Sequence, residues 1–206
     1  DGIAITLQEN VSDTDFTASG VYDFTITGNT IESDTDNLAG TIERGDKAEG
    51  IKFTINEGVQ NGTTNLTAVI ENNDIQTRIG DGSEFAVNEL AADGVVFDAN
   101  ITINNNRIVQ TNDNPVGSEN KDPRDLIKAT FGEDGEGSIT TGTFTITNNT
   151  VTSAAGAGDA FNYESLSTST SNIFKFKLEG NNVTAADDKD LKIIVPTGYL
   201  SISAPD

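Results

Sequence analysis

Side chains that could hold a cation are gathered in short acidic clusters along the chain. Six of these carboxylates are candidate metal ligands, namely Asp34, Asp36, Asp134, Glu136, Asp187 and Asp188. Calcium takes six to eight oxygen ligands, and closely spaced acids beside glycine can supply some of them. None of the clusters has the spacing of an EF-hand loop or of a nonapeptide calcium repeat. We therefore favour solvated acidic turns over specific calcium sites.

Residue types that act as nucleophiles or bases are scarce. The chain has no cysteine and no histidine, so thiolate nucleophiles, imidazole bases, disulfides and the usual zinc sites are excluded. A polysaccharide lyase needs a basic side chain beside calcium-holding acids, and a hydrolase needs paired carboxylates at a defined separation. The segment 122–125 (DPRD) is interpreted as a loop turn in which Arg124 pairs with a neighbouring acid. The sequence predicts no catalytic residue and no required cofactor, and it leaves calcium open.

The composition limits the partners of the chain. Twelve basic residues stand against 33 acidic ones, a formal charge of −21, which makes nucleic acid and anionic membranes poor partners. No apolar stretch approaches the roughly 20 residues of a membrane helix, so we expect no membrane insertion. Hydrophobic residues make up 34% of the chain, which indicates a thin core rather than one large one.

One short template recurs five times. It reads apolar, any, apolar, any, any, Asn, any, apolar, as in DFTITGNTI and NITINNNRI. Its apolar positions are Phe24, Ile26, Ile31; Ala68, Ile70, Ile75; Ile101, Ile103, Ile108; Phe144, Ile146, Val151; and Phe176, Leu178, Val183. Its asparagines are Asn29, Asn73, Asn106, Asn149 and Asn181.

The template predicts two strands joined by a bend. Alternation of its first apolar positions is a strand signal, and the extra residue at the asparagine breaks that period. A tight bend there would point both strands into one core. Asparagine suits the bend because it tolerates left-handed backbone and its amide can bond to local backbone or to a stacked copy of itself.

A second repeated strand precedes each template and gives coil starts near residues 2, 50, 94, 126, 158 and 190. The last three starts are 32 residues apart, so the longer early steps indicate insertions. We place the insertions at Ser33–Ala48, Thr77–Asp93, Val109–Pro123 and Gly132–Thr141. Within the second, Glu84–Ala92 (EFAVNELAA) has helical character and could form a short lateral helix or a cover for one end. Residues 1–206 are expected to form one domain, a segment of a longer surface protein.

Strands that recur at this period without helices between them should pair in parallel with the equivalent strand of the next coil. Parallel crossovers are almost always right-handed. The sequence therefore predicts an all-β fold, a right-handed parallel β-helix (solenoid) of about five to six coils. The alternative is an antiparallel β-sandwich, whose strands also alternate and whose turns also favour Asn and Gly.

The repeats resemble those of the pectin-lyase-like superfamily and of bacterial surface proteins such as autotransporter passenger domains. The resemblance implies that Asn29, Asn73, Asn106, Asn149 and Asn181 form a stacked ladder at a two-residue bend. The ladder is structural, so the resemblance specifies architecture and not activity.

For function, we expect a non-catalytic adhesive or structural module of a prokaryotic protein that is secreted or displayed on the cell surface. Its partners would be a protein or glycan of a host or neighbouring cell, or a second copy of the chain. Two alternatives stay open: a calcium-assisted polysaccharide lyase, and a filament subunit that stacks end to end.

Overall fold

Strands make up all the regular structure that can be described. The computed structural model describes residues 2–8, 20–33, 50–57, 63–77, 83–89, 96–110, 125–131, 139–153, 159–165, 173–184 and 191–194. In these residues the strands form three sheets, which we call A, B and C, and every strand pairing is parallel. The all-β prediction is confirmed, and the antiparallel sandwich is wrong because neighbouring strands run in the same direction.

Each sheet takes one strand from each passage of the chain. Sheet A contains, in order, β1 (Ile3–Gln8), β4 (Ile51–Glu57), β7 (Ser83–Glu89), β10 (Ile127–Phe131), β13 (Phe161–Ser165) and β16 (Leu191–Ile194). Sheet B contains β2 (Gly20–Thr27), β5 (Thr63–Glu71), β8 (Val96–Asn104), β11 (Ile139–Thr147) and β14 (Ile173–Glu179). Sheet C contains β3 (Thr30–Ser33), β6 (Asp74–Thr77), β9 (Arg107–Gln110), β12 (Thr150–Ser153) and β15 (Asn182–Thr184).

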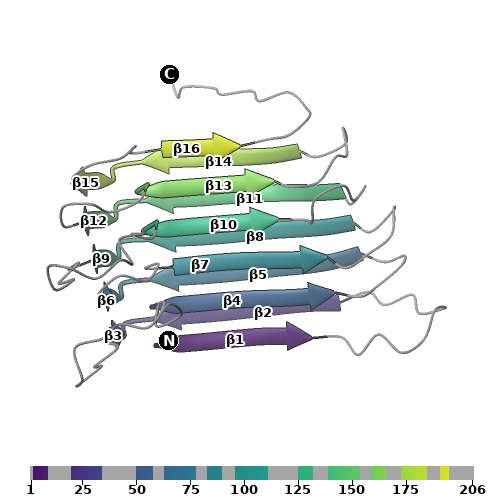
Figure 1. Ribbon diagram of the computed structural model, residues 1–206, viewed down its shortest axis with the longest axis horizontal. Coiled ribbons are helices and arrows are strands. Elements are labelled where there is room, and N and C mark those ends of the chain that lie inside the picture. The colour runs from purple at the N-terminus through teal and green to yellow at the C-terminus, as the bar shows by residue number, and fades with distance from the viewer. Residues whose placement is uncertain are drawn as a thin grey trace, which may run out of the picture.

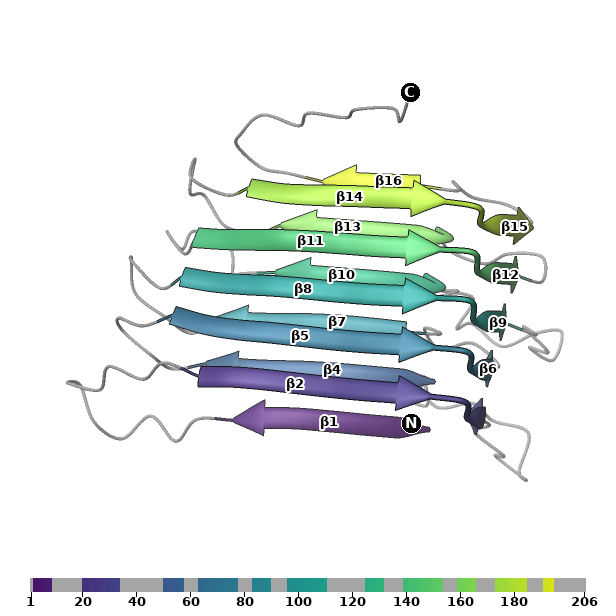
Figure 2. The same cartoon turned by 180° about the vertical axis from the view of Figure 1, so that it is seen from behind.

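The chain passes through sheets A, B and C in that order five times and then enters sheet A once more. We call one such passage a coil. Figure 1 shows the strands of sheet A in front and those of sheet B behind them, pointing the opposite way, with the short strands of sheet C along one edge. The view from behind gives the same order, with β1 at one end of the stack and β16 at the other (Figure 2).

The core lies between sheets A and B. In the three middle template copies every predicted apolar position is buried, from Ala68 to Val151. Aromatic rings meet across the two sheets, as between Phe24 and Phe53, whose ring centroids are 5.2 Å apart. Only the first and last copies expose template positions in part, and Leu178 is the most open of these at 36%.

The third coil differs from the sequence expectation. Its sheet A strand is β7, which begins at Ser83, and not a strand that starts at Gly94. The residues after Gly94 lead instead into β8, the sheet B strand of that coil. The second predicted insertion, Thr77–Asp93, therefore contains the sheet A strand of the third coil, β7.

The helix predicted within Glu84–Ala92 is wrong for the residues that the structure describes. Glu84–Glu89 belong to β7, which pairs with β4 on one side and with β10 on the other. Helix propensity is a weak preference, and hydrogen bonding to two neighbouring strands overrides it. Residues 90–92 lie outside the described part of the chain.

Candidate functional site

Each passage from sheet B to sheet C turns on two residues, of which the second is the predicted asparagine. The first has a left-handed backbone in every coil. These residues and their φ angles are Gly28 (70°), Asn72 (57°), Asn105 (53°), Asn148 (56°) and Gly180 (66°). Glycine and asparagine are the residues that adopt this conformation most readily. The left-handed backbone thus belongs to the preceding residue and not, as we expected, to the predicted asparagine.

The second residue of each bend carries the ladder. The structure stacks Asn29, Asn73, Asn106, Asn149 and Asn181 one above the other along the corner. At Asn106, Oδ1 accepts hydrogen bonds from the backbone N–H of Asn73 at 2.9 Å and from its Nδ2 at 3.0 Å. Nδ2 of Asn106 donates to Oδ1 of Asn149 at 3.1 Å and to the carbonyl oxygen of Ile70 at 2.9 Å.

These four bonds are all that an amide side chain can make. Asn73 and Asn149 make the same set with their own neighbours. Each of the three is at most 2% exposed. Because their donors and acceptors are used inside the ladder, these amides hold the corner together and offer nothing to a ligand.

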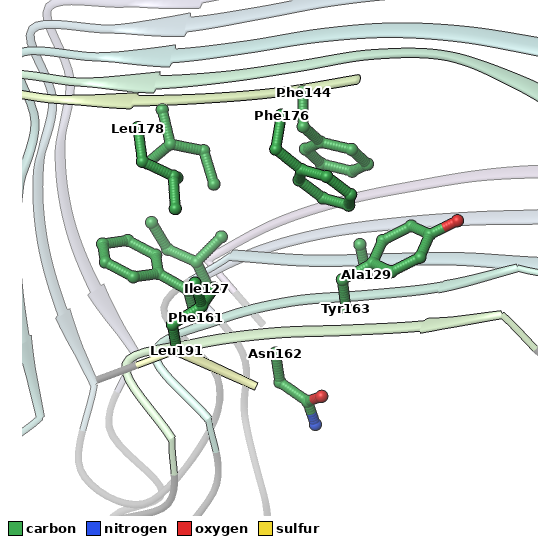
Figure 3. Close-up of a pocket in the computed structure, with 10 residues that line it drawn as sticks. Ile127, Ala129, Phe144, Phe161, Asn162, Tyr163, Phe176, Leu178 and Leu191 are labelled. Atoms are coloured by element: carbon green, nitrogen blue, oxygen red, sulfur yellow. The ribbon is translucent and has the colours of Figure 1, made fainter. Parts of the chain in front are cut away.

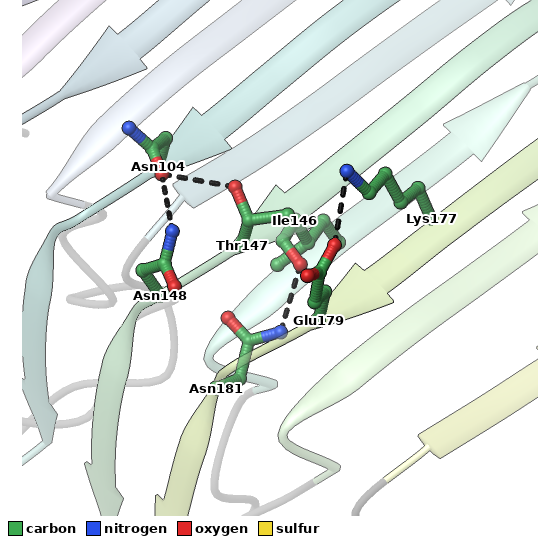
Figure 4. Close-up of polar contacts among 7 residues, drawn as sticks. All are labelled: Asn104, Ile146, Thr147, Asn148, Lys177, Glu179 and Asn181. Atoms are coloured by element: carbon green, nitrogen blue, oxygen red, sulfur yellow. Dashed lines mark hydrogen bonds and ion pairs between the residues drawn. The ribbon is translucent and has the colours of Figure 1, made fainter. Parts of the chain in front are cut away.

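The two end rungs keep unused capacity. We call each ladder asparagine a rung. In the inner rungs Nδ2 donates to a backbone carbonyl of the preceding coil, whereas Nδ2 of Asn29 donates to Thr27 O of its own coil at 3.1 Å. Asn181 donates to Ile146 O at 2.7 Å (Figure 4). Among the described residues, nothing donates to Oδ1 of Asn29, and the backbone N–H of Asn181 has no acceptor.

The candidate metal ligands lie where the structure cannot test them. Asp34, Asp36, Asp134, Glu136, Asp187 and Asp188 are all outside the described residues. Within the described ranges, no three histidine, cysteine, aspartate or glutamate residues are grouped so that they could hold a metal ion. The solvated acidic turns that we favour, and the alternative calcium sites, both stay predictions.

Two aspartates and an asparagine, a combination that the sequence analysis did not bring together, meet where sheet A strands begin. Oδ1 of Asp125 accepts the backbone N–H of Asp159 at 2.8 Å, and Oδ2 accepts Nδ2 of Asn162 at 2.6 Å. Asp159 is only 4% exposed, and Oδ1 of Asn162 is buried with no hydrogen-bond partner. Both acids stand two residues before a sheet A strand, and this shared position is the signal that could have revealed them. Asp125, from the DPRD segment, thus links two coils; Arg124 is outside the described residues.

The outward side chains of sheet B form a polar surface that spans five strands. We call this surface the outer face of sheet B. Two of its register columns are Asp23, Thr67, Asn100, Thr143, Lys175 and Thr25, Val69, Thr102, Thr145, Lys177, all partly or fully exposed. Near the corner, Oδ1 of Asn104 accepts hydrogen bonds from Thr147 Oγ1 at 2.9 Å and from Asn148 Nδ2 at 3.2 Å (Figure 4). The threonine hydroxyls and asparagine amides of this face suit hydrogen bonding to a polar partner.

Exposed tyrosine rings can stack on sugars, but the two tyrosines that the structure describes are not open platforms. Tyr163 is 5% exposed and belongs to the core, and Tyr22 is half-buried against it. Tyr199 lies outside the described residues.

In the described part of the chain there is no helix of the length and apolar character needed to cross a membrane. No protein family, curated protein or solved structure matches the chain.

Proposed function

We propose that the chain is a right-handed parallel β-helix that serves as a non-catalytic adhesive or structural module of a secreted or cell-surface prokaryotic protein. The observation that carries the proposal is the buried ladder. Its inner amides make all of their hydrogen bonds to neighbouring coils. Such bonding stabilises a rigid scaffold and leaves no donor or acceptor for a reaction.

Two further observations support the winding. Equivalent strands of successive coils pair in parallel in all three sheets. In Figure 1, sheet A runs to the right in front and sheet B to the left behind as the chain rises from β1 to β16, which is the sense of a right-handed helix. Parallel crossovers have this hand almost without exception. The resemblance to pectin-lyase-like repeats agrees with the same architecture.

The outer face of sheet B is the proposed adhesive surface. Four of its five strands have eight or nine residues and the fifth has seven, whereas those of sheet C have three or four. Its side chains recur at the spacing of parallel strands, about 4.8 Å, so the surface is flat and regular. A rigid, flat face loses little conformational entropy when a partner binds. Cysteine avoidance suits a protein that is exported, and the acidic surface suits solubility outside the cell.

The test is a binding screen of the immobilised chain against cell surfaces, glycans and extracellular proteins. We expect a partner whose affinity falls at least tenfold when Thr102→Asp and Thr145→Asp are combined. The matched control combines Thr30→Asp and Thr150→Asp on sheet C, which adds the same charge to exposed threonines. Equal losses for both pairs, or no partner at all, would contradict the proposal. Release of unsaturated sugars from an acidic polysaccharide in calcium would contradict its non-catalytic part.

A further inference from the structure

The two ends of the stack have complementary edges. We propose that two copies of this chain associate end to end, with β2 and β3 of one copy pairing with the outer edges of β14 and β15 of the other. This inference goes beyond adhesion and rests on the coiled winding proposed above, not on the adhesive surface. In the described part of the chain, no strand pairs with these four edges.

The ladder is polar and can continue across such a junction. Asn181 keeps a backbone N–H and an amide hydrogen that inner rungs donate to the next asparagine, and Asn29 keeps the Oδ1 that would accept them. Nδ2 of Asn29 could then leave Thr27 O for the carbonyl of Leu178, which occupies the register position of Ile146. The junction would have the same bonds as an inner rung.

The outer face of sheet B has matching side chains at its two ends. One register column reads Val21, Asn65, Asp98, Thr141, Ile173, so it is apolar only at the ends. Val21 is 72% exposed and Ile173 is 61% exposed, more than the other large hydrophobic residues described. Extending the register by one strand would place Ile173 of one copy beside Val21 of the next.

The adjacent column carries opposite charges at its ends. It reads Asp23, Thr67, Asn100, Thr143, Lys175, with an acid at the first coil and a base at the last. Both charged side chains are exposed. The same extension would place Lys175 beside Asp23, and oppositely charged cross-strand neighbours stabilise a sheet. On a chain with a net charge of −21, such a local match favours one orientation of association.

Among the described strands, none continues sheet B beyond β14, so the described part of the chain leaves the core open there. A cavity of about 20 Å³ lies there between the inner sides of sheets A and B, and its lining includes Phe144, Tyr163, Phe176 and Leu178 (Figure 3). Leu191, also in the lining, is 40% exposed. In the proposed junction, Phe24 and Ile26 of the next copy would take the register positions that follow Phe176 and Leu178, and so would cover this opening.

Sheet A has one strand more than sheets B and C, so the junction requires an exchange. An incoming β1 and the resident β16 would occupy the same edge of β13, where β16 pairs through four residues. β1 has six residues and places Ile3 and Ile5 at the register positions of Leu191 and Ile193. In the associated form β1 therefore replaces β16.

The test is sedimentation of the full chain over a range of concentrations, with charge reversal at the junction. We expect reversible end-to-end species, visible as rods in negative-stain images. Lys175→Glu or Asp23→Lys alone should raise the dissociation constant roughly tenfold, because each replaces an attractive pair with a repulsive one. The double variant should restore it. Arg107→Glu, in the middle of sheet C, has the same charge change as Lys175→Glu and should leave association unchanged.

A disulfide tests the exchange. The chain has no cysteine, and Asn162 is the register partner of Lys192 across β13 and β16. Asn162→Cys with Lys192→Cys should block association when oxidised and permit it when reduced. A chain that stays monomeric at its highest soluble concentration, association that ignores the charge reversals, or association of the oxidised variant would overturn the proposal. The adhesion screen does not depend on any of these outcomes.

Discussion

The middle of the asparagine ladder and its two ends have the same two-residue bend but different surroundings. Asn106 is 2% exposed and bonded to the coils before and after it, whereas Asn29 is exposed and bonded to one neighbouring coil. The core follows the same rule, since Ile103 is fully buried and its counterpart Leu178 is 36% exposed. We expect the contribution of a residue to stability to depend on how many coils it contacts, because each coil contacts only its neighbours.

A charge placed on the ladder should give the largest difference between its middle and its ends. Asn106→Asp removes two donors and leaves buried oxygens of Ile70 and Asn149 facing a carboxylate. We expect the free energy of unfolding to fall by about 4 kcal/mol. Asn29→Asp should cost less than about 1 kcal/mol because water can reach that position. Urea denaturation of both variants measures the difference, and equal costs would show that the ladder ends are as constrained as its middle.

Truncation of the core gives the next effect. Ile103→Ala should lower the free energy of unfolding by about 3 kcal/mol, through lost burial and the cavity left behind. Leu178→Ala, at the same register column in the last coil, should cost only about 1 kcal/mol since part of that side chain already contacts solvent. Thermal unfolding followed by circular dichroism distinguishes the two. A larger loss for Leu178 would mean that the last coil is covered more fully than its exposure indicates.

Two glycines with positive φ test the same difference between inner and end coils at the backbone. A Cβ added at Gly142, within sheet B, would lie 1.9 Å from the carbonyl oxygen of Ala99, while one added at Gly28 would meet nothing within 4 Å. Gly142→Ala should therefore cost about 3 kcal/mol, and Gly28→Ala only the strain of left-handed backbone, about 1 kcal/mol. Gly28→Asn should restore most of that smaller loss, because asparagine fills the same position in the three middle coils. Denaturation midpoints would contradict this if both alanine variants were equivalent.

The smallest effect is expected on the outer surface. Arg107 Nη1 lies 2.6 Å from Asp74 Oδ1, and both side chains are about half exposed, at 53% and 49%. Exposed pairs of this kind contribute about 0.5 kcal/mol and are screened by salt. A double-mutant cycle with Arg107→Ala and Asp74→Ala should give a coupling of this size that declines in high salt. A coupling several times larger would mean that surface pairs, like ladder rungs, link coils strongly.

Much of the fold could be predicted because the bend repeats a rare combination. Five asparagines in one phase with flanking apolar residues located the sheet B and sheet C strands, as Ile101, Ile103 and Ile108 illustrate. The third sheet A strand was missed because the segment GVVF, which begins at Gly94, resembles the start of the other coils. Spacing would have corrected it. Ile51 precedes Asn73 by 22 residues and Ile127 precedes Asn149 by 22, while Gly94 precedes Asn106 by only 12.

The candidate sites were less predictable, for a physical reason. A ladder amide is recognisable because every coil needs it, so the sequence repeats it. The cluster of Asp125, Asp159 and Asn162 links two coils only, and its members are brought together by strand register and not by a motif. The register column that runs from Val21 to Ile173 can likewise be recognised only when the pairing of all five strands is known.

The constant bend between sheets B and C has a consequence for how such a chain can change in evolution. Each bend takes two residues, whereas the stretch from β3 to β4 is far longer than that from β6 to β7. Every bend fixes the register of its coil against the preceding coil. Extra residues inserted between bends can therefore lengthen a connection without shifting the register of later strands. Lineages could therefore lengthen or exchange the connecting segments one at a time, testing new surfaces while the stacked frame stays in phase.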